Sequence, residues 1–185
     1  MSIYRLAPDA VAAKVIALHG GRAAFLAHTD AQVAELNLRW NQDSALMGLI
    51  LRSHLFVEYY LGRYLQLHNP SLGDVDDARL SFAQKVDLID RNDRAVAYLI
   101  PGIRRLNKIR NRLAHSLNEG VTEEDRDVFL SVDLFRALRD AMAAPSVPSH
   151  APIDVLESFA QHAGMVLDAS VDPRAGYWVE ALKAP

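Results

Sequence analysis

The chain has 185 residues, half of them apolar and 23% charged, with a formal net charge of −3 at pH 7. This composition is typical of a globular protein with its own core, and its acidic balance excludes a generally basic nucleic-acid binder. The absence of cysteine excludes disulfides and thiolate metal sites, and no window suggests an export signal or a membrane span, so we expect a cytoplasmic protein without membrane contact.

The first 42 residues predict a helical arm. Residues 10–19 read as one helix, closed by Gly20 and Gly21. Residues 22–38 continue as helix, and we expect an interruption at Thr29-Asp30, because both residues favour helix N-caps.

The middle of the chain predicts a bundle over residues 43–143. Asp43 and Ser44 cap a long helix over 45–67, whose nearly continuous apolar residues indicate a central position. A shorter helix follows over 80–89. The capping-box pattern at Thr122 to Asp125 then opens a helix that we expect to run to Ala143.

The last segment, residues 144–185, predicts a linker and a helical extension. Residues 144–151 contain three prolines, and Pro152 begins a helix to about Leu167. No strand-like alternation occurs anywhere. The expected fold is therefore all-α.

The stretch Leu99 to His115 carries the most information. Pro101 suits a first helical turn, and an apolar stripe is spaced by three or four residues: Leu99, Ile103, Leu106, Ile109 and Leu113. Arg110 falls inside this stripe on a helical wheel. A charge there must be paired, hydrogen-bonded, or open onto a solvent cleft or a partner chain.

The residues RNRLAH, Arg110 to His115, resemble the ribonuclease motif of the HEPN superfamily, an Arg and a His separated by four to six residues. The resemblance extends over roughly Ala45 to Asn118. It implies an up-and-down helical bundle, here with extra N- and C-terminal helices, and catalytic roles for Arg110, Asn111 and His115. Many toxin members have a tyrosine two positions after the histidine, where this chain has Leu117.

RNA cleavage without a metal or cofactor needs proton transfer and positive charge at the phosphate. His115 can transfer protons near neutral pH, and Arg110 offers a donor fork that matches phosphate oxygens. We predict substrate-binding roles for four further basic residues: Arg104, Arg105, Lys108 and Arg112. His54 and Glu58, one turn apart, could ligate a metal, but two residues are no metal site. We expect them to form a polar notch facing Arg110, and Tyr59 and Tyr60 to pack.

Arg110 and His115 lie about 140° apart on a straight helix, so their side chains cannot meet at one phosphate. Either the helix bends or ends before His115, or a second copy completes the site. HEPN proteins commonly pair two motifs across a two-fold axis, so we expect a homodimer with a composite site.

Three interpretations follow. The first is a metal-independent endoribonuclease acting on RNA, of a toxin or phage-defence kind, with an antitoxin or regulatory protein as a further partner. The second is a non-catalytic HEPN-fold dimer that binds RNA or protein. In the third, Arg110 merely forms a structural ion pair with Glu58 or Asp87.

Overall fold

The computed structural model describes residues 7–40, 43–73, 75, 78–115 and 120–171, without the side chains of Arg39, Trp40, Leu72 and His115. Within these ranges the chain forms eight α-helices, two short 3₁₀ helices and no strand. This confirms the predicted all-α fold. The chain divides into two compact units, residues 1–42 and 43–185.

The first unit consists of α1 (Pro8–Leu18) and α2 (Arg22–Trp40). No residue of α1 is buried. The interruption predicted at Thr29-Asp30 does not occur. Helix α2 is continuous there, and the Thr29 hydroxyl donates to the Phe25 carbonyl one turn before it (2.9 Å) instead of capping a new helix. None of the described helices alone has the length and apolar character to cross a bilayer. Helices α1 and α2 have this length and character only when they are taken together, across an 89° bend.

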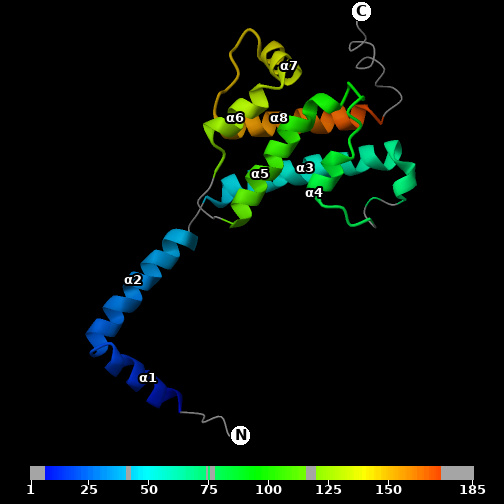
Figure 1. Ribbon diagram of the computed structural model, residues 1–185. Helices are drawn as coiled ribbons and strands as arrows, with labels where there is room; N and C mark the ends of the chain where they lie inside the picture. The colour runs from blue at the N-terminus through cyan, green and yellow to red at the C-terminus, as the bar shows by residue number, and fades with distance from the viewer. Residues whose placement is uncertain (1–6, 41–42, 74, 76–77, 116–119, 172–185) are drawn as a thin grey trace, which may run out of the picture. The chain divides into compact units, whose positions relative to one another are not determined.

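The second unit is built on the pair α3 (Ser44–His68) and α8 (Pro152–Ala169), which lie side by side in Figure 1. Helix α5 (Ile100–His115) packs against both. The remaining elements surround these three helices: η1 (Pro70–Leu72), α4 (Phe82–Asp87), η2 (Ala97–Leu99), α6 (Glu123–Leu130) and α7 (Asp133–Ala143).

Helix α8 belongs to the core, which corrects its predicted place in a C-terminal extension. Its buried residues cover most of its length: Val155, Leu156, Phe159, Ala160, Ala163, Gly164, Val166 and Leu167. The prolines of residues 144–151 suggested a linker to a separate extension, but a segment of this kind marks a surface connection as readily as a domain boundary. Here it connects α7 to α8 within one unit.

The helix predicted from Thr122 to Ala143 is two helices, α6 and α7. Ser131 and Val132 separate them, and Val132 has an extended conformation (ψ 92°). In one straight helix, positions 129 and 135 would point about 120° apart. The break lets the rings of Phe129 and Phe135 both pack on Phe159, at centroid distances of 4.9 and 5.3 Å.

The predicted stripe of α5 is buried throughout, each of its five residues being at most 7% exposed. Helix α5 begins at Ile100, so Pro101 occupies its first turn as predicted. Gly102 follows at the contact with α8, where an added Cβ would lie 2.2 Å from Cζ of Phe159. This close approach requires glycine.

We therefore expect Gly102→Ala to lower the free energy of unfolding by about 2 to 3 kcal/mol, because the fully buried Phe159 ring has no space to retreat. Gly48→Ala on α3 is the control. A Cβ there meets nothing within 4 Å, so alanine should stabilise by about 0.5 to 1 kcal/mol through helix propensity. Urea denaturation measures both, and equal effects would contradict this packing.

A buried Tyr–His pair joins η2 to α8. The Tyr98 hydroxyl and Nε2 of His162 share a hydrogen bond (2.9 Å). Burial raises the pKa of Tyr98 above its usual value of 10, so the hydroxyl keeps its proton. Burial also lowers the pKa of His162 from 6.5 to about 4. The folded chain therefore holds His162 neutral where the unfolded chain protonates it.

This pair predicts acid destabilisation. Between pH 6.5 and 4 the unfolded state binds more protons than the folded state. The contribution of His162 to the free energy of unfolding should therefore be greatest above pH 6.5 and fall by about 1 to 3 kcal/mol towards pH 4. His162→Gln keeps a hydrogen-bond partner for Tyr98 but does not titrate, so it should remove most of this fall in the free energy of unfolding. His54 and Asp125, whose pKa values are also lowered, contribute to the remaining loss. Superimposable pH profiles of the two proteins would refute the assignment.

Candidate functional site

The rotation of α5 distributes its polar residues around three sides. Taking Leu106 as the centre of the buried stripe, the 100° step places Asn107, Arg110 and Asn111 at about 100°, 40° and 140°. Arg105 and Arg112 fall on the opposite side, at about −100° and −120°. Arg104, Lys108 and position 115 fall on the outer face. The predicted basic cluster is therefore three separate groups.

Arg110 is exposed, although it falls inside the stripe on the helical wheel. Its side chain lines a pocket of about 300 Å³ between α3, α4 and α5. The pocket residues are His54, Glu58, Ser81, Phe82, Ala83, Asn107, Arg110 and Asn111. Two of the expected surroundings of this arginine are present, because its guanidinium donates to Oδ1 of Asn111 (3.3 Å) and also borders a pocket open to solvent. His54 and Glu58 form the predicted polar notch beside it.

Both asparagines in this pocket have a contact at the amide oxygen. Nε2 of His54 contacts Oδ1 of Asn107 (3.4 Å), and Nη1 of Arg110 donates to Oδ1 of Asn111 (3.3 Å). The NH₂ groups of Asn107 and Asn111 can donate to a ligand, and each amide oxygen keeps a second lone pair. With the guanidinium of Arg110, these NH₂ groups make a set of hydrogen-bond donors.

A chain of contacts from Lys85 through Glu58 to His54 borders these donors. Oε1 of Glu58 accepts a hydrogen bond from Nζ of Lys85 (3.0 Å), while Oε2 lies 3.8 Å from Nδ1 of His54. Burial is the main reason that the pKa of His54 is lowered from 6.5, and the nearby Arg110 and Lys85 charges add to it, against the opposing effects of Asn107 and Glu58. His54 is therefore neutral at pH 7.

The ion pair between Lys85 and Glu58 argues against a metal at His54 and Glu58, because the carboxylate already has a cationic partner. In the part of the chain that the structure describes, no group of three or more His, Cys, Asp or Glu side chains could hold a metal ion. With His54 neutral, the charged side chains that line the pocket are Glu58 and Arg110. Lys85, outside the pocket lining, pairs with Glu58 and compensates its charge, which leaves the positive charge of Arg110. A net positive pocket with planar donors suits an anion such as a phosphodiester.

Arg105 and Arg112 instead bind a fully buried carboxylate, Asp125 of α6. Nε of Arg105 donates to Oδ1 (2.5 Å), and Arg112 donates to both oxygens. Burial alone would raise the pKa of Asp125, but hydrogen bonds from Arg112, Thr122 and Arg105 together lower it from 3.8 to about 2. The two arginines thus attach α5 to α6, on the side away from the pocket.

The outer face holds the rest of the predicted site. Arg104 pairs with Asp87 (2.6 Å), and Lys108 is exposed. Helix α5 continues through His115, whose side chain lies outside the described residues. The catalytic roles of Arg110, Asn111 and His115 remain predictions. So do the substrate-binding roles of Arg104, Arg105, Lys108 and Arg112. Among the residues of these two sets whose side chains the structure describes, Arg110 and Asn111 line the pocket.

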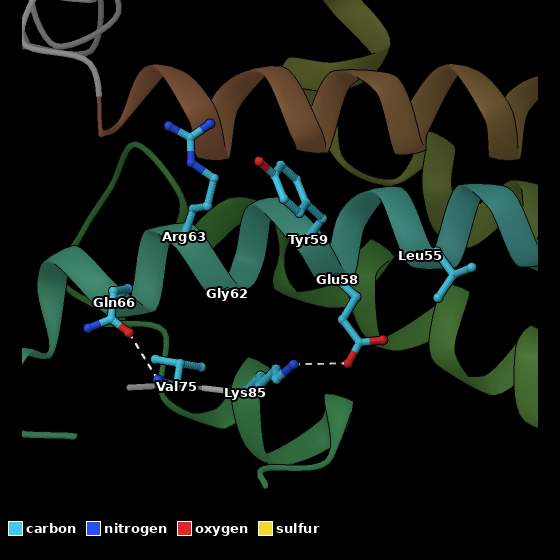
Figure 2. Close-up of a pocket in the computed structure, with 8 residues that line it drawn as sticks. All are labelled: Leu55, Glu58, Tyr59, Gly62, Arg63, Gln66, Val75 and Lys85. Carbon is cyan, nitrogen blue, oxygen red and sulfur yellow. Dashed lines mark hydrogen bonds and ion pairs between the residues drawn. The ribbon is translucent and has the colours of Figure 1, made fainter. Parts of the chain in front are cut away.

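A second pocket, of about 520 Å³, adjoins the first and shares Glu58 with it. Figure 2 shows Tyr59 and Arg63 on one side of α3, Glu58 and Lys85 on the other, and Gly62 between them. We call this pocket the Gly62 groove. Sequence reasoning missed it, and the packing role expected for Tyr59 is wrong, since that side chain is 61% exposed. A glycine inside a long helix was the available signal.

No family model, no curated protein and no solved structure matches this chain.

Replacing an arginine that pairs with Asp125 and replacing the arginine that lines the pocket should change the free energy of unfolding by different amounts. Arg112→Ala leaves the buried Asp125 carboxylate partly unpaired and should cost about 2 to 4 kcal/mol of unfolding free energy. Arg110→Ala should change it by less than about 0.5 kcal/mol, because this side chain is exposed and its described hydrogen bond is to the adjacent Asn111. Thermal or urea denaturation tests both. A large cost for Arg110→Ala would mean that Arg110 is structural.

Proposed function

We propose that this protein is a metal-independent endoribonuclease of the HEPN type. The observation that carries the proposal is the exposed Arg110 of the RNRLAH motif, which lines a pocket with the donor-bearing side chains Asn107 and Asn111. A guanidinium used only for structure would be engaged as Arg112 is. Arg110 instead borders an open, net positive pocket of a size that admits a phosphate group.

The proposed reaction is attack of a ribose 2′-oxygen on the adjacent phosphorus. His115 accepts the proton of the 2′-hydroxyl, the bond from phosphorus to the 5′-oxygen breaks, and the leaving oxygen takes up a proton from water. The products are a 2′,3′-cyclic phosphate and a 5′-hydroxyl end. Arg110 stabilises the charge that develops on the phosphate oxygens, and Asn107 and Asn111 donate to the same oxygens.

The site requires two copies of the chain in this proposal. Because α5 is one helix through His115, position 115 lies about 140° around it from Arg110. A two-fold dimer would bring His115 of one copy to Arg110 of the other, and so form two equivalent sites. A toxin or defence role with a regulatory protein partner belongs to the same proposal.

A non-catalytic dimer that binds RNA or protein is the second candidate. Leu51 and Leu55 of α3 favour it, because they are 43% and 63% exposed, one turn apart. Apolar side chains arranged in this way are common where proteins contact one another.

Cleavage of a labelled RNA pool in EDTA tests the enzyme. The wild type should produce cyclic-phosphate ends, and Arg110→Ala and His115→Ala should each reduce the rate at least 100-fold while remaining folded and dimeric. Arg136→Ala, at an exposed arginine of α7 that has no role in this proposal, is the control and should retain most activity. No cleavage by the wild type over varied RNAs would favour the binding module.

Mixing the two inactive variants tests the composite site. After random exchange of subunits, half of the dimers contain one chain of each kind, and each of these has one intact site, so about a quarter of the wild-type rate should return. A mixture as inactive as its components would show that Arg110 and His115 act within one chain or not at all.

A further inference from the structure

The Gly62 groove continues from the Arg110 pocket along α3. Glu58 belongs to both pockets, and Lys85, which lines the groove, holds that carboxylate at their junction (3.0 Å). An endonuclease binds nucleotides on both sides of the bond that it cleaves. A strand with its phosphate at Arg110 would therefore extend, in one direction, into this groove.

The charges in the groove cancel locally. Lys85 pairs with Glu58, and Nη1 of Arg63 pairs with Oδ1 of Asp168 (2.8 Å). A second phosphate would gain little here, because each cation already has a carboxylate beside it. The groove therefore suits a neutral group that can still form hydrogen bonds.

The shape of the groove favours a flat aromatic ligand. Tyr59 is 61% exposed and stands on one side of Gly62, as Figure 2 shows. The guanidinium carbon of Arg63 lies 6.0 Å from the centre of the Tyr59 ring, within reach of a cation–π contact. A Cβ at Gly62 would meet nothing within 4 Å, so the groove is open above Gly62, and Tyr59 lines the same groove. Exposed aromatic rings of this kind stack on nucleobases.

We infer that the Gly62 groove binds a nucleobase next to the scissile phosphate, stacked on Tyr59 and read by Glu58. This inference rests on the proposed RNA substrate and adds a base preference to it. Lys85 occupies Oε1 of Glu58, and Oε2 lies beyond hydrogen-bond distance from His54, at 3.8 Å. Oε2 is therefore an acceptor for a base amino group.

A carboxylate acceptor distinguishes between bases. Adenine, cytosine and guanine each carry an exocyclic amino group that can donate to Glu58, whereas uracil has carbonyl oxygens at the equivalent positions. We expect uracil to bind about tenfold more weakly than cytosine, a pyrimidine of the same size. Glu58→Gln should reduce this difference, because an amide can also donate to the uracil carbonyls.

Binding of 2′-O-methyl oligonucleotides, measured by fluorescence anisotropy, tests the inference without requiring cleavage. Oligocytidine should bind more tightly than oligouridine of the same length. Gly62→Leu fills the groove without disturbing a described contact, and should abolish the preference and weaken cytidine binding about tenfold. Gly48→Leu, on the same helix and outside the groove, is the matched control. Tyr59→Phe should retain binding, and Tyr59→Ala should lose it as Gly62→Leu does.

Each outcome is decisive for one proposal or the other. A cytidine preference that Gly62→Leu removes, in a protein that cleaves no RNA, supports the base site and defeats the nuclease. Cleavage with neither a base preference nor an effect of Gly62→Leu overturns only the base site. The absence of oligonucleotide binding also overturns the base site, and the cleavage assay then decides the nuclease separately. If Gly62→Leu and Tyr59→Ala change the mass in solution while oligonucleotide binding is unaffected, the groove is instead a contact between copies of the chain.

Discussion

Burial of one stripe of α5 is the constraint on which the candidate site depends. The stripe fixes the rotation of the helix, because turning it would expose side chains such as Leu106 and Ile109 that are now fully packed. Once the rotation is fixed, every polar residue of α5 has a defined direction. The same apolar packing that stabilises the bundle therefore decides which arginines meet a carboxylate and which meet solvent.

Arg112 and Arg110 lie two residues apart on α5, yet their side chains have very different surroundings. Arg112 binds a carboxylate with no exposed surface, in a capping box that begins α6. Its charge is needed to compensate for a buried one. Arg110 lies where α3, α4 and α5 leave a polar pocket, and its neighbours there are amides, a neutral histidine and a carboxylate already paired with Lys85. Such a pocket retains positive charge for a ligand.

Much of the fold follows from the sequence, because helix periodicity and capping are local. The α5 stripe, the Asp43 cap of α3 and the Thr122 cap of α6 are at their predicted places. The break at Ser131 was not predictable, because it depends on two rings reaching Phe159. The core position of α8 depends likewise on its packing against α3, which no local pattern encodes.

The candidate site was predictable only in part, for the same reason. A helical wheel identified Arg110 as anomalous and spread the basic residues over several faces of α5. It could not show which neighbour each face meets, because that requires knowing that Asp125 lies against Arg105 and Arg112 and that α3 and α4 border Arg110. The Gly62 groove depends on the loop around Val75 and on α4, which are distant from Gly62 in the sequence.

The central claim is that Arg110, and not the other arginines of α5, contacts the RNA backbone. Side-chain nitrogen NMR of the intact protein during titration with a 2′-O-methyl oligonucleotide tests it most directly. The account predicts that the signals of Arg110, Asn107 and Asn111 shift together, while those of Arg105 and Arg112 remain in place. Shifts at Arg105 and Arg112, with Arg110 unchanged, would contradict it.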